Sequence, residues 1–209
     1  MTITSIQEYD KRKVLIQLDG HLIFPLYKSE AAKLHLLEGE DISAEVYSEI
    51  TGKILPKRAR LRAIHLLQKR SYTRESLRRK LADGKYPEDI ITEALDYVES
   101  YGYIDDERYA AEYIRCYCES RSKRRIMQDL FVKGISKDVA ESAWIHHEAL
   151  NEPVDEVAQI KKLLRKKQFD AASADRKETA KVINYLYRKG YSTESIMYCV
   201  KCDEYYTNL

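Results

Sequence analysis

The chain has 209 residues, of which 44% are hydrophobic and 33% are charged, and its formal net charge is +2. This composition excludes a disordered chain and leaves room for one sizeable domain or two small ones. The sequence contains no run of 18 apolar residues, so no membrane span is predicted. Residues 1–10 lack the basic and apolar segments of a signal peptide. We therefore expect a cytoplasmic protein without a membrane segment, whose four cysteines are reduced thiols.

Residues 1–26 are predicted to form a small β-meander. Asp19-Gly20 is a strong signal for a two-residue hairpin turn, because both positions accept a positive φ. Pro25 is expected to end the last strand or to mark an edge of the sheet. A meander of this size is marginal alone, so it must pack against helices. Branched and aromatic residues predict strands at residues 13–18 and 21–24, with a weaker strand at residues 2–7.

Two short helices are expected after the strands. Ser29 is a candidate cap for the first, which extends to Leu37, and Ser43 is a candidate start for the second. Gly52 and Pro56 are expected to end the second helix. We place a domain boundary near Pro56, because β character stops there and helical periodicity begins.

An internal repeat follows from Lys57 onward, and it centres on a helix corner. In each copy a leucine ends a helix, a glycine caps it, an apolar residue fills the corner, and Pro or Ser starts the next helix. In the first copy Gly84 stands one position ahead of the aligned Lys85. The copies begin at Leu81, Leu130 and Leu186, with offsets of 49 and 56 residues.

Each repeat has room for three helices. The sequence therefore predicts a mainly α fold of three tandem three-helix repeats in an elongated right-handed array, preceded by a small β-hairpin or meander. The expected domains are residues 1–56, 57–104, 105–152 and 153–209. The nine helices of the repeats are expected at residues 57–69, 73–83, 87–100, 105–119, 122–133, 136–149, 153–167, 176–189 and 192–202.

The joint between the first two repeats lies at Gly102. Glycine tolerates the left-handed backbone that ends a helix, and Asp105 or Asp106 can open the next helix by accepting free N–H groups. Ile104 and Tyr109 are expected to be largely buried at this joint. The helix after it carries an apolar stripe that includes Tyr109, Tyr113 and Tyr117.

Three motifs recur in a fixed order along the repeats: Gly102–Ala110, Lys133-Gly134-Ile135 and Arg188-Lys189-Gly190-Tyr191. Through this ordered set the chain resembles the bacterial RecX regulatory proteins over about residues 58–202. Ile104 and Tyr109 stand where that family usually has Leu and Phe, and Ser122 stands where glycine is frequent. The N-terminal β segment lies outside the resemblance.

The resemblance implies a function without catalysis. It implies tandem three-helix repeats that bind the RecA recombinase filament and modulate it, mostly by inhibiting its recombinase, ATPase and filament-extension activities. The implied setting is DNA repair, DNA recombination and the SOS response. We expect a monomer without a cofactor or metal, and DNA is the second partner that we consider.

The basic residues form three clusters, one in each repeat. Residues 57–80 contain ten Lys or Arg and one Glu, whereas residues 88–108 contain eight Asp or Glu and one Arg. The other basic clusters lie at residues 121–125 and 161–167. A charge run is usually a solvated face, but three clusters at similar places in successive repeats predict a basic stripe. Such a stripe suits phosphates or an acidic protein groove.

Arginine suits both kinds of partner, because its planar fork binds carboxylates and phosphates. The predicted filament-binding residues are Arg74, Arg78, Arg121, Arg124 and Arg125, with Arg58 and Arg62 as lesser candidates. The first alternative function is a stand-alone helical DNA-binding module, and the second is a general helical scaffold. A salt-sensitive DNA affinity that does not depend on recombinase would favour the first alternative.

The motifs that bind nucleotides or metals are missing from the sequence. The seven glycines make neither a phosphate loop nor a dinucleotide turn. Cys199-x-x-Cys202 has metal spacing, but no second pair completes four ligands, and Cys116-x-Cys118 points two ways on a helix. No set of nucleophile, base and acid can be identified, so we expect that the protein is not an enzyme.

Overall fold

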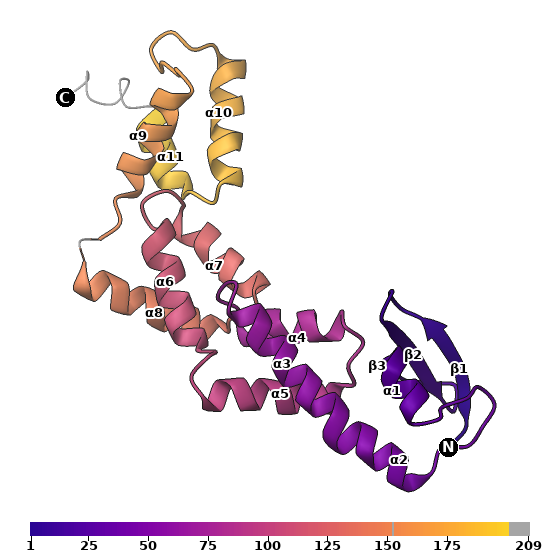
Figure 1. Cartoon of the computed structure of the whole chain (residues 1–209). Coiled ribbons are helices and arrows are strands. Elements are labelled where there is room, and N and C mark those ends of the chain that lie inside the picture. The colour runs from indigo at the N-terminus through magenta and orange to yellow at the C-terminus, as the bar shows by residue number, and fades with distance from the viewer. Residues whose placement is uncertain (152, 201–209) are drawn as a thin grey trace. The chain divides into compact units, whose positions relative to one another are not determined.

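The computed structural model describes residues 1–151 and 153–200. It divides the chain into two compact units, which we call unit 1 (Met1–Asp105) and unit 2 (Asp106–Leu209). Within the described residues, unit 1 contains a three-stranded sheet and the first three-helix repeat, and unit 2 contains two further three-helix repeats (Figure 1). Cys202 and the end of the last predicted helix lie outside the described residues.

The N-terminal meander is confirmed. Ile16 pairs with Phe24 across the sheet, and both are fully buried because alternate residues of a strand point to the core. Asp19 and Gly20 both have a positive φ, 48° and 76°, but the loop also includes His21 and is one residue longer than predicted. Pro25 lies within an edge strand. The sheet is antiparallel and consists, in spatial order, of β1 (Ile3–Glu8), β2 (Lys13–Leu18) and β3 (Leu22–Tyr27).

The helices after the sheet differ in part from the prediction. The cap of the first is Tyr27 rather than Ser29, because the Glu30 carboxylate accepts the Tyr27 amide at 3.2 Å and closes the N-terminus there. This helix ends at Lys33, so the prediction that it extends to Leu37 was wrong. The second is capped by Ser43, as predicted. The segment consists of α1 (Lys28–Lys33), α2 (Ala44–Glu49), the π-helical η1 (Ile50–Ile54) and α3 (Leu55–Leu67).

The prediction that Gly52 and Pro56 end a helix was wrong. Helical backbone runs without interruption from α2 through η1 into α3 (Figure 1). The Leu55 amide donates to the Ile50 carbonyl, five residues back, so the turn before the proline is widened. Pro56 then lies in the first turn of α3, where its missing N–H is tolerated.

A single hydrophobic core joins the sheet to the first repeat. Buried residues of β2 and β3 belong to the same cluster as buried residues of the three helices of the repeat. The change of secondary structure near Pro56 therefore lies inside one packed unit, and the finer division into four domains stays a prediction. Members of this cluster include Ile16, Leu18, Phe24, Leu26, Leu55, Leu77, Leu81 and Ile91.

Each repeat consists of three helices, of which the first and third pack directly against each other. In repeat 1 they are α3, α4 (Arg74–Ala82) and α5 (Glu88–Ser100). In repeat 2 they are α6 (Asp106–Tyr117), α7 (Lys123–Val132) and α8 (Lys137–Leu150). In repeat 3 they are α9 (Glu156–Lys166), α10 (Arg176–Arg188) and α11 (Thr193–Val200).

The corner between the second and third helices recurs as predicted, with one correction. Leu81, Leu130 and Leu186 are all fully buried at the ends of their helices. In the first corner the left-handed residue is Lys85, with a φ of 63°, and Gly84 does not take that role. A Cβ on Gly84 would approach the Leu81 carbonyl at 3.0 Å, so the glycine there provides space.

At the joint, Gly102 has a φ of 69° and Ile104 is 3% exposed, as predicted. Tyr109, the other residue expected at this joint, is partly buried. Ile104 packs into the core of unit 1, whereas Tyr109 packs at the side of the core of unit 2. Tyr103 is 55% exposed, so of the two residues between Gly102 and Asp105 it is Ile104 that is buried.

Candidate binding surface

The basic residues of α4 face the acidic helix that follows them. Arg74 contacts two carboxylates on α5, Asp96 at 2.5 Å and Glu99. Arg60 on α3 likewise contacts Glu93 on α5. The two opposite charge runs of the sequence therefore meet across the helices of repeat 1, and much of their charge is neutralised within it.

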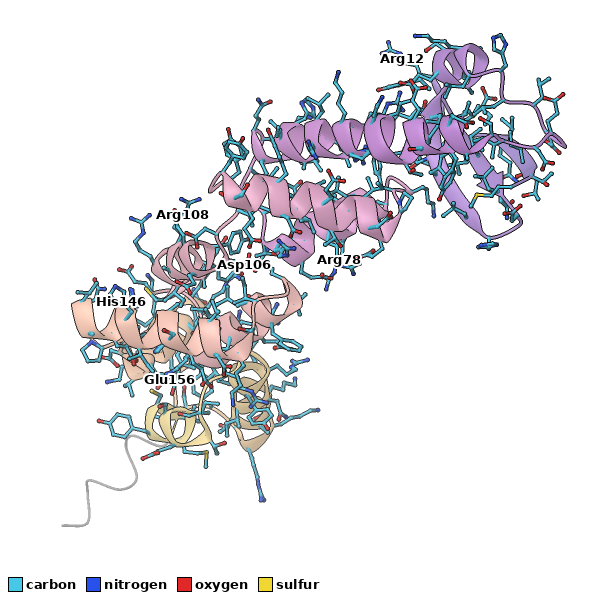
Figure 2. All side chains as sticks on the ribbon, turned by 90° about the horizontal axis from the view of Figure 1, so that it is seen from below. Arg12, Arg78, Asp106, Arg108, His146 and Glu156 are labelled. Carbon is cyan, nitrogen blue, oxygen red and sulfur yellow. The ribbon has the colours of Figure 1, made fainter. Side chains whose placement is uncertain are left out.

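Arg78 is engaged in the same way (Figure 2). It contacts Glu75 on its own helix at 2.8 Å and Glu88 at the start of α5 at 3.2 Å. Arg79 also contacts Glu75, at 2.8 Å, as the helical spacing predicts. Hydrogen bonds from the guanidinium of Arg78 lower the pKa of Glu75 below its usual value. A contact of Arg74 or Arg78 with a filament stays a prediction, and it requires these pairs to exchange partners.

Arg58 joins α3 to the sheet and to α1. Its guanidinium stacks on the Tyr27 ring at 3.8 Å and contacts the Glu30 carboxylate. The side chain is only 12% exposed, so it serves as a packed link between elements. Arg62, one turn further along α3, reaches the Lys80 carbonyl at 3.5 Å and contacts no carboxylate among the described residues.

A basic pocket of about 370 Å³ lies in unit 2, where repeats 2 and 3 meet. We call it the junction pocket. It brings together basic side chains that lie more than sixty residues apart in sequence. The residues that line it are Ser120, Arg121, Ser122, Arg125, Arg188, Lys189 and Tyr191.

The junction pocket is positioned by a contact between two helix ends. The Ser122 hydroxyl caps α7 by accepting the Arg125 amide at 3.3 Å, and it donates to the Lys189 carbonyl at 2.7 Å, at the end of α10. Gly190 follows with a φ of 86°. A Cβ on Gly190 would lie 2.8 Å from the Ser122 oxygen, so both the backbone conformation and the space require glycine.

The charges in the junction pocket are not balanced. Asp129 accepts from Arg121 at 2.7 Å and from Arg125 at 3.0 Å, so one carboxylate serves two guanidinium groups. The Arg188 guanidinium donates to a backbone carbonyl at 3.4 Å, and the Lys189 ammonium lies 5.2 Å from the Tyr185 ring centre. The pocket therefore presents a positive surface to solvent.

Arg124 differs from the other predicted arginines in unit 2, Arg121 and Arg125, in forming no ion pair with a described carboxylate. It is exposed on the first turn of α7, and its guanidinium lies 5.9 Å from the centre of the Tyr187 ring. Tyr187 is itself 53% exposed. Within residues 1–151 and 153–200 no carboxylate lies within ion-pair distance of Arg124, so this arginine and its neighbouring aromatic ring can contact a partner.

Repeat 3 leaves its basic residues without carboxylate partners. Residues 153–200 contain ten Lys or Arg and six Asp or Glu. Asp155 and Asp175 cap α9 and α10, and Glu156 accepts the Ser192 hydroxyl at 2.6 Å (Figure 2). Among the described residues of this repeat no ion pair forms. Asp155, Asp170 and Asp175 accept backbone amides instead. The predicted cluster at residues 161–167 is therefore available on α9.

Of the basic residues that line the junction pocket, Arg121 and Arg125 are among the predicted binding residues, whereas Arg188 and Lys189 are not. The last two were recognised as part of the repeated corner, and the corner itself was the signal that could have found them. A corner that abuts the preceding repeat brings its basic residues to the start of α7. That contact depends on tertiary packing, and the linear sequence does not contain it.

Other kinds of site are absent from the described residues. No group of three or more His, Cys, Asp or Glu side chains within them is arranged to hold a metal ion. Cys116, Cys118 and Cys199 are free thiols. No helix in the described part of the chain has both the length and the apolar character that crossing a membrane requires.

The fold defines a protein of tandem three-helix domains with basic side chains exposed on unit 2. Three family profiles match in chain order, the RecX first three-helix domain at residues 59–97, the second at residues 105–143 and the third at residues 154–200. A regulatory protein RecX from Vibrio vulnificus is 34% identical over 139 residues, which cover 66% of this chain and 88% of the relative. The chain belongs to the RecX family of regulatory proteins.

Longer alignments include the N-terminal sheet. A regulatory protein RecX from Caldanaerobacter subterraneus is 29% identical over 198 residues, covering 94% of this chain and 96% of the relative. A crystal structure of regulatory protein RecX aligns with a TM-score of 0.58 at 24% identity, covering 97% of this chain and 99% of that one. RecX from Lactobacillus salivarius aligns with a TM-score of 0.56 at 23% identity, covering 70% of this chain and 95% of that one. At these identities the two structures show that the chain shares their fold.

Proposed function

We propose that this protein is a non-enzymatic regulator of the RecA recombinase. It binds the nucleoprotein filament and mostly inhibits the recombinase, ATPase and filament-extension activities that serve DNA repair and recombination. We further propose that it acts in the cytoplasm as a monomer. Membership of the RecX family supports the choice of RecA, and the physical properties of the surface support the mode of binding.

The observation that carries the proposal is the unbalanced positive charge of unit 2. The junction pocket, Arg124 and the basic face of α9 present more positive charge than the described carboxylates neutralise, and in the pocket one carboxylate, Asp129, pairs with both Arg121 and Arg125. A nucleoprotein filament offers both carboxylates and phosphates, and guanidinium groups bind either with two parallel hydrogen bonds. Binding of this kind is steered by charge and weakens as salt rises.

The first experiment measures RecA ATPase and filament assembly on single-stranded DNA, with and without this protein. We expect slower ATP hydrolysis and shorter filaments in its presence. An unchanged rate and unchanged assembly at saturating protein would contradict the proposal. The sign of the effect also tells inhibition from stimulation.

A second measurement separates the proposal from the stand-alone DNA-binding module. Binding to naked DNA and to the RecA filament is compared for the wild type and for the double variant Arg124→Ala with Arg188→Ala. The proposal predicts a larger loss of affinity for the filament than for naked DNA. Equal losses on both, with binding that does not depend on RecA, would favour the DNA module. Arg115→Ala, at an exposed arginine of α6 outside the junction pocket, is the matched control.

A further inference from the structure

Unit 1 contains a second concave surface, which lies between the sheet and α3. Its volume is about 630 Å³, within the range of small-ligand sites. We call it the sheet groove. The junction pocket lies in the other unit, so the two surfaces have no residue in common. Residues from β2, β3, α1, η1, α3 and the first corner line it: Lys13, Pro25, Tyr27, Glu30, Lys53, Ile54, Lys57, Arg58, Leu61, Arg62, His65 and Tyr86.

The charge of the sheet groove is strongly one-sided. Glu30 is its single carboxylate among the described lining residues, and Arg58 already contacts it. Lys53, Lys57 and Arg62 contact no carboxylate in the described part of the chain. The Nε atom of Arg62 is buried without a hydrogen-bond partner. A buried donor that lacks an acceptor is costly, so an acidic group that enters here would supply what the folded chain does not.

The sheet groove also has an apolar side. Leu61 is 57% exposed although it lies on a helix with a well-packed opposite face, and Ile54 and Pro25 lie beside it in the lining. Exposed leucines are common singly, but here the leucine lies among cations in a concave surface. A partner that satisfies this lining needs negative charge and an aliphatic or aromatic side chain together.

One observation argues against a nucleic acid, and a second restricts how a peptide can bind. The Tyr27 ring is covered by Arg58 at 3.8 Å on one face, and Tyr86, the other tyrosine of the lining, is partly buried against the core of unit 1, so there is no open aromatic platform on which bases stack. Pro25 lacks an amide hydrogen on the outer strand, so a simple β-strand addition to β3 is also blocked there. Recognition must therefore come from side chains in the groove.

We propose that the sheet groove binds a short acidic segment of a partner protein that carries at least one leucine-like or aromatic side chain. The acidic groups contact Lys53, Lys57 and Arg62, and the apolar side chain covers Leu61. Arg58 is a positioning residue, because Tyr27 and Glu30 hold its guanidinium in place. This inference does not rest on the proposed function, and it gives the N-terminal sheet a role in forming one wall of a binding site.

The test uses a fluorescein-labelled peptide of alternating glutamate and leucine, with fluorescence anisotropy as the readout on the full-length protein. Three comparison probes are used: a glutamate–serine peptide, a lysine–leucine peptide and an oligothymidylate of equal length. The protein variants are Lys57→Glu and Leu61→Ser. Lys69→Glu is the matched control, because Lys69 is an exposed lysine of the same unit that does not line the groove.

We expect Lys57→Glu to weaken binding of the glutamate–leucine peptide by about tenfold or more and Lys69→Glu to change it by less than about twofold. Leu61→Ser should weaken binding of that peptide by about threefold or more, and it should leave the weak binding of the glutamate–serine peptide unchanged. Circular dichroism melting confirms that each variant is folded.

Three results would overturn the inference. One is an equal loss of affinity in Lys57→Glu and Lys69→Glu, which would indicate attraction by total charge. Another is equal binding of the two glutamate peptides, which would remove the apolar contact. The third is tighter binding of the oligothymidylate with the same dependence on Lys57, which would assign the groove to nucleic acid.

Discussion

Repeat 1 and repeat 3 both carry many basic residues, yet they place their carboxylates differently. In repeat 1 the acids lie on α5, opposite the arginines of α4, and they form ion pairs across the two helices. In repeat 3 the acids lie at helix starts and in turns, where they accept N–H and O–H groups. Similar compositions therefore give ion-paired charges between α4 and α5 in repeat 1 and basic side chains without described carboxylate partners in repeat 3.

The comparison shows why a count of charges along the sequence does not locate a binding surface. An exposed basic residue is available to a partner when the fold leaves it without a carboxylate, and that depends on the helix packed beside it. Arg74 contacts two carboxylates of the neighbouring helix, whereas the guanidinium of Arg124 lies near an aromatic ring. Surface ion pairs contribute little to stability. Their main effect in this protein is to decide which basic side chains remain available to a binding partner.

The largest effect on stability is expected at Gly190. Gly190→Val places a branched side chain at a φ of 86°, 2.8 Å from the Ser122 oxygen, and should destabilise unit 2 by about 2–4 kcal/mol. Gly102→Val has the same backbone problem at a φ of 69° but meets open space, so about 1–2 kcal/mol is expected. Chemical denaturation of both variants measures the two losses in free energy of unfolding and shows whether Gly190→Val has the larger one. Equal losses would mean that the contact between the two helix ends contributes nothing.

The next effect distinguishes a structural arginine from an available one. Arg58→Ala removes the Glu30 contact and the stacking on Tyr27 and should cost about 1–3 kcal/mol of unfolding free energy. Arg124→Ala should cost less than about 0.5 kcal/mol, because its side chain is exposed and contacts no described carboxylate. Thermal melting measures both. A comparable loss of stability in the two variants would contradict the distinction between Arg58, which is packed between elements, and Arg124, which is exposed.

A smaller effect is expected when the charge pairs of repeat 1 are removed. Changing Arg74 and Arg78 together to Ala breaks contacts between α4 and α5, but the partners are well exposed, so the thermal midpoint should fall much less than in Arg58→Ala. The midpoint difference should shrink further in high salt. A fall as large as that of Arg58→Ala would show that the exposed pairs contribute strongly to stability.

The smallest change is a gain in stability. Lys85 occupies the left-handed position in the first corner, where the other two copies have glycine. Lys85→Gly should therefore stabilise unit 1 by about 0.5–1 kcal/mol. Lys69→Gly is the control, because Lys69 has no positive φ. Equal losses of stability in both variants would show that the strain at Lys85 is relieved elsewhere.

Local signals explain why so much of the fold can be predicted from the sequence. Ser43, Ser122 and Ser136 each cap the helix that they were expected to start, because a hydroxyl before an apolar periodic run is a local feature. The helix that continues through Gly52 and Pro56 could not be predicted, because a π-helical turn compensates for the proline. The choice of Lys85 over Gly84 depends on space beside Leu81 and Tyr86.

The candidate site was predictable only in part. Arg121, Arg124 and Arg125 were recognised from a local cluster, and the structure places them at the start of α7 and beside it. Arg188 and Lys189 join them through the contact of Ser122 with the end of α10. Likewise, the neutralisation of Arg74 cannot be predicted without knowing that α5 packs beside α4. Contacts between distant segments therefore decide which basic residues remain available.

The most direct test of this account is RecA ATPase on single-stranded DNA, measured against increasing concentrations of two triple variants. One has Arg124, Arg188 and Lys189 changed to Ala in unit 2, and the other has Arg74, Arg78 and Arg79 changed to Ala in unit 1. Both remove three positive charges, and each is checked by circular dichroism. We predict that the unit 2 variant needs about tenfold or more protein for half-maximal inhibition, while the unit 1 variant stays within about threefold of the wild type. A greater loss in the unit 1 variant would contradict the claim that its arginines are neutralised within the fold.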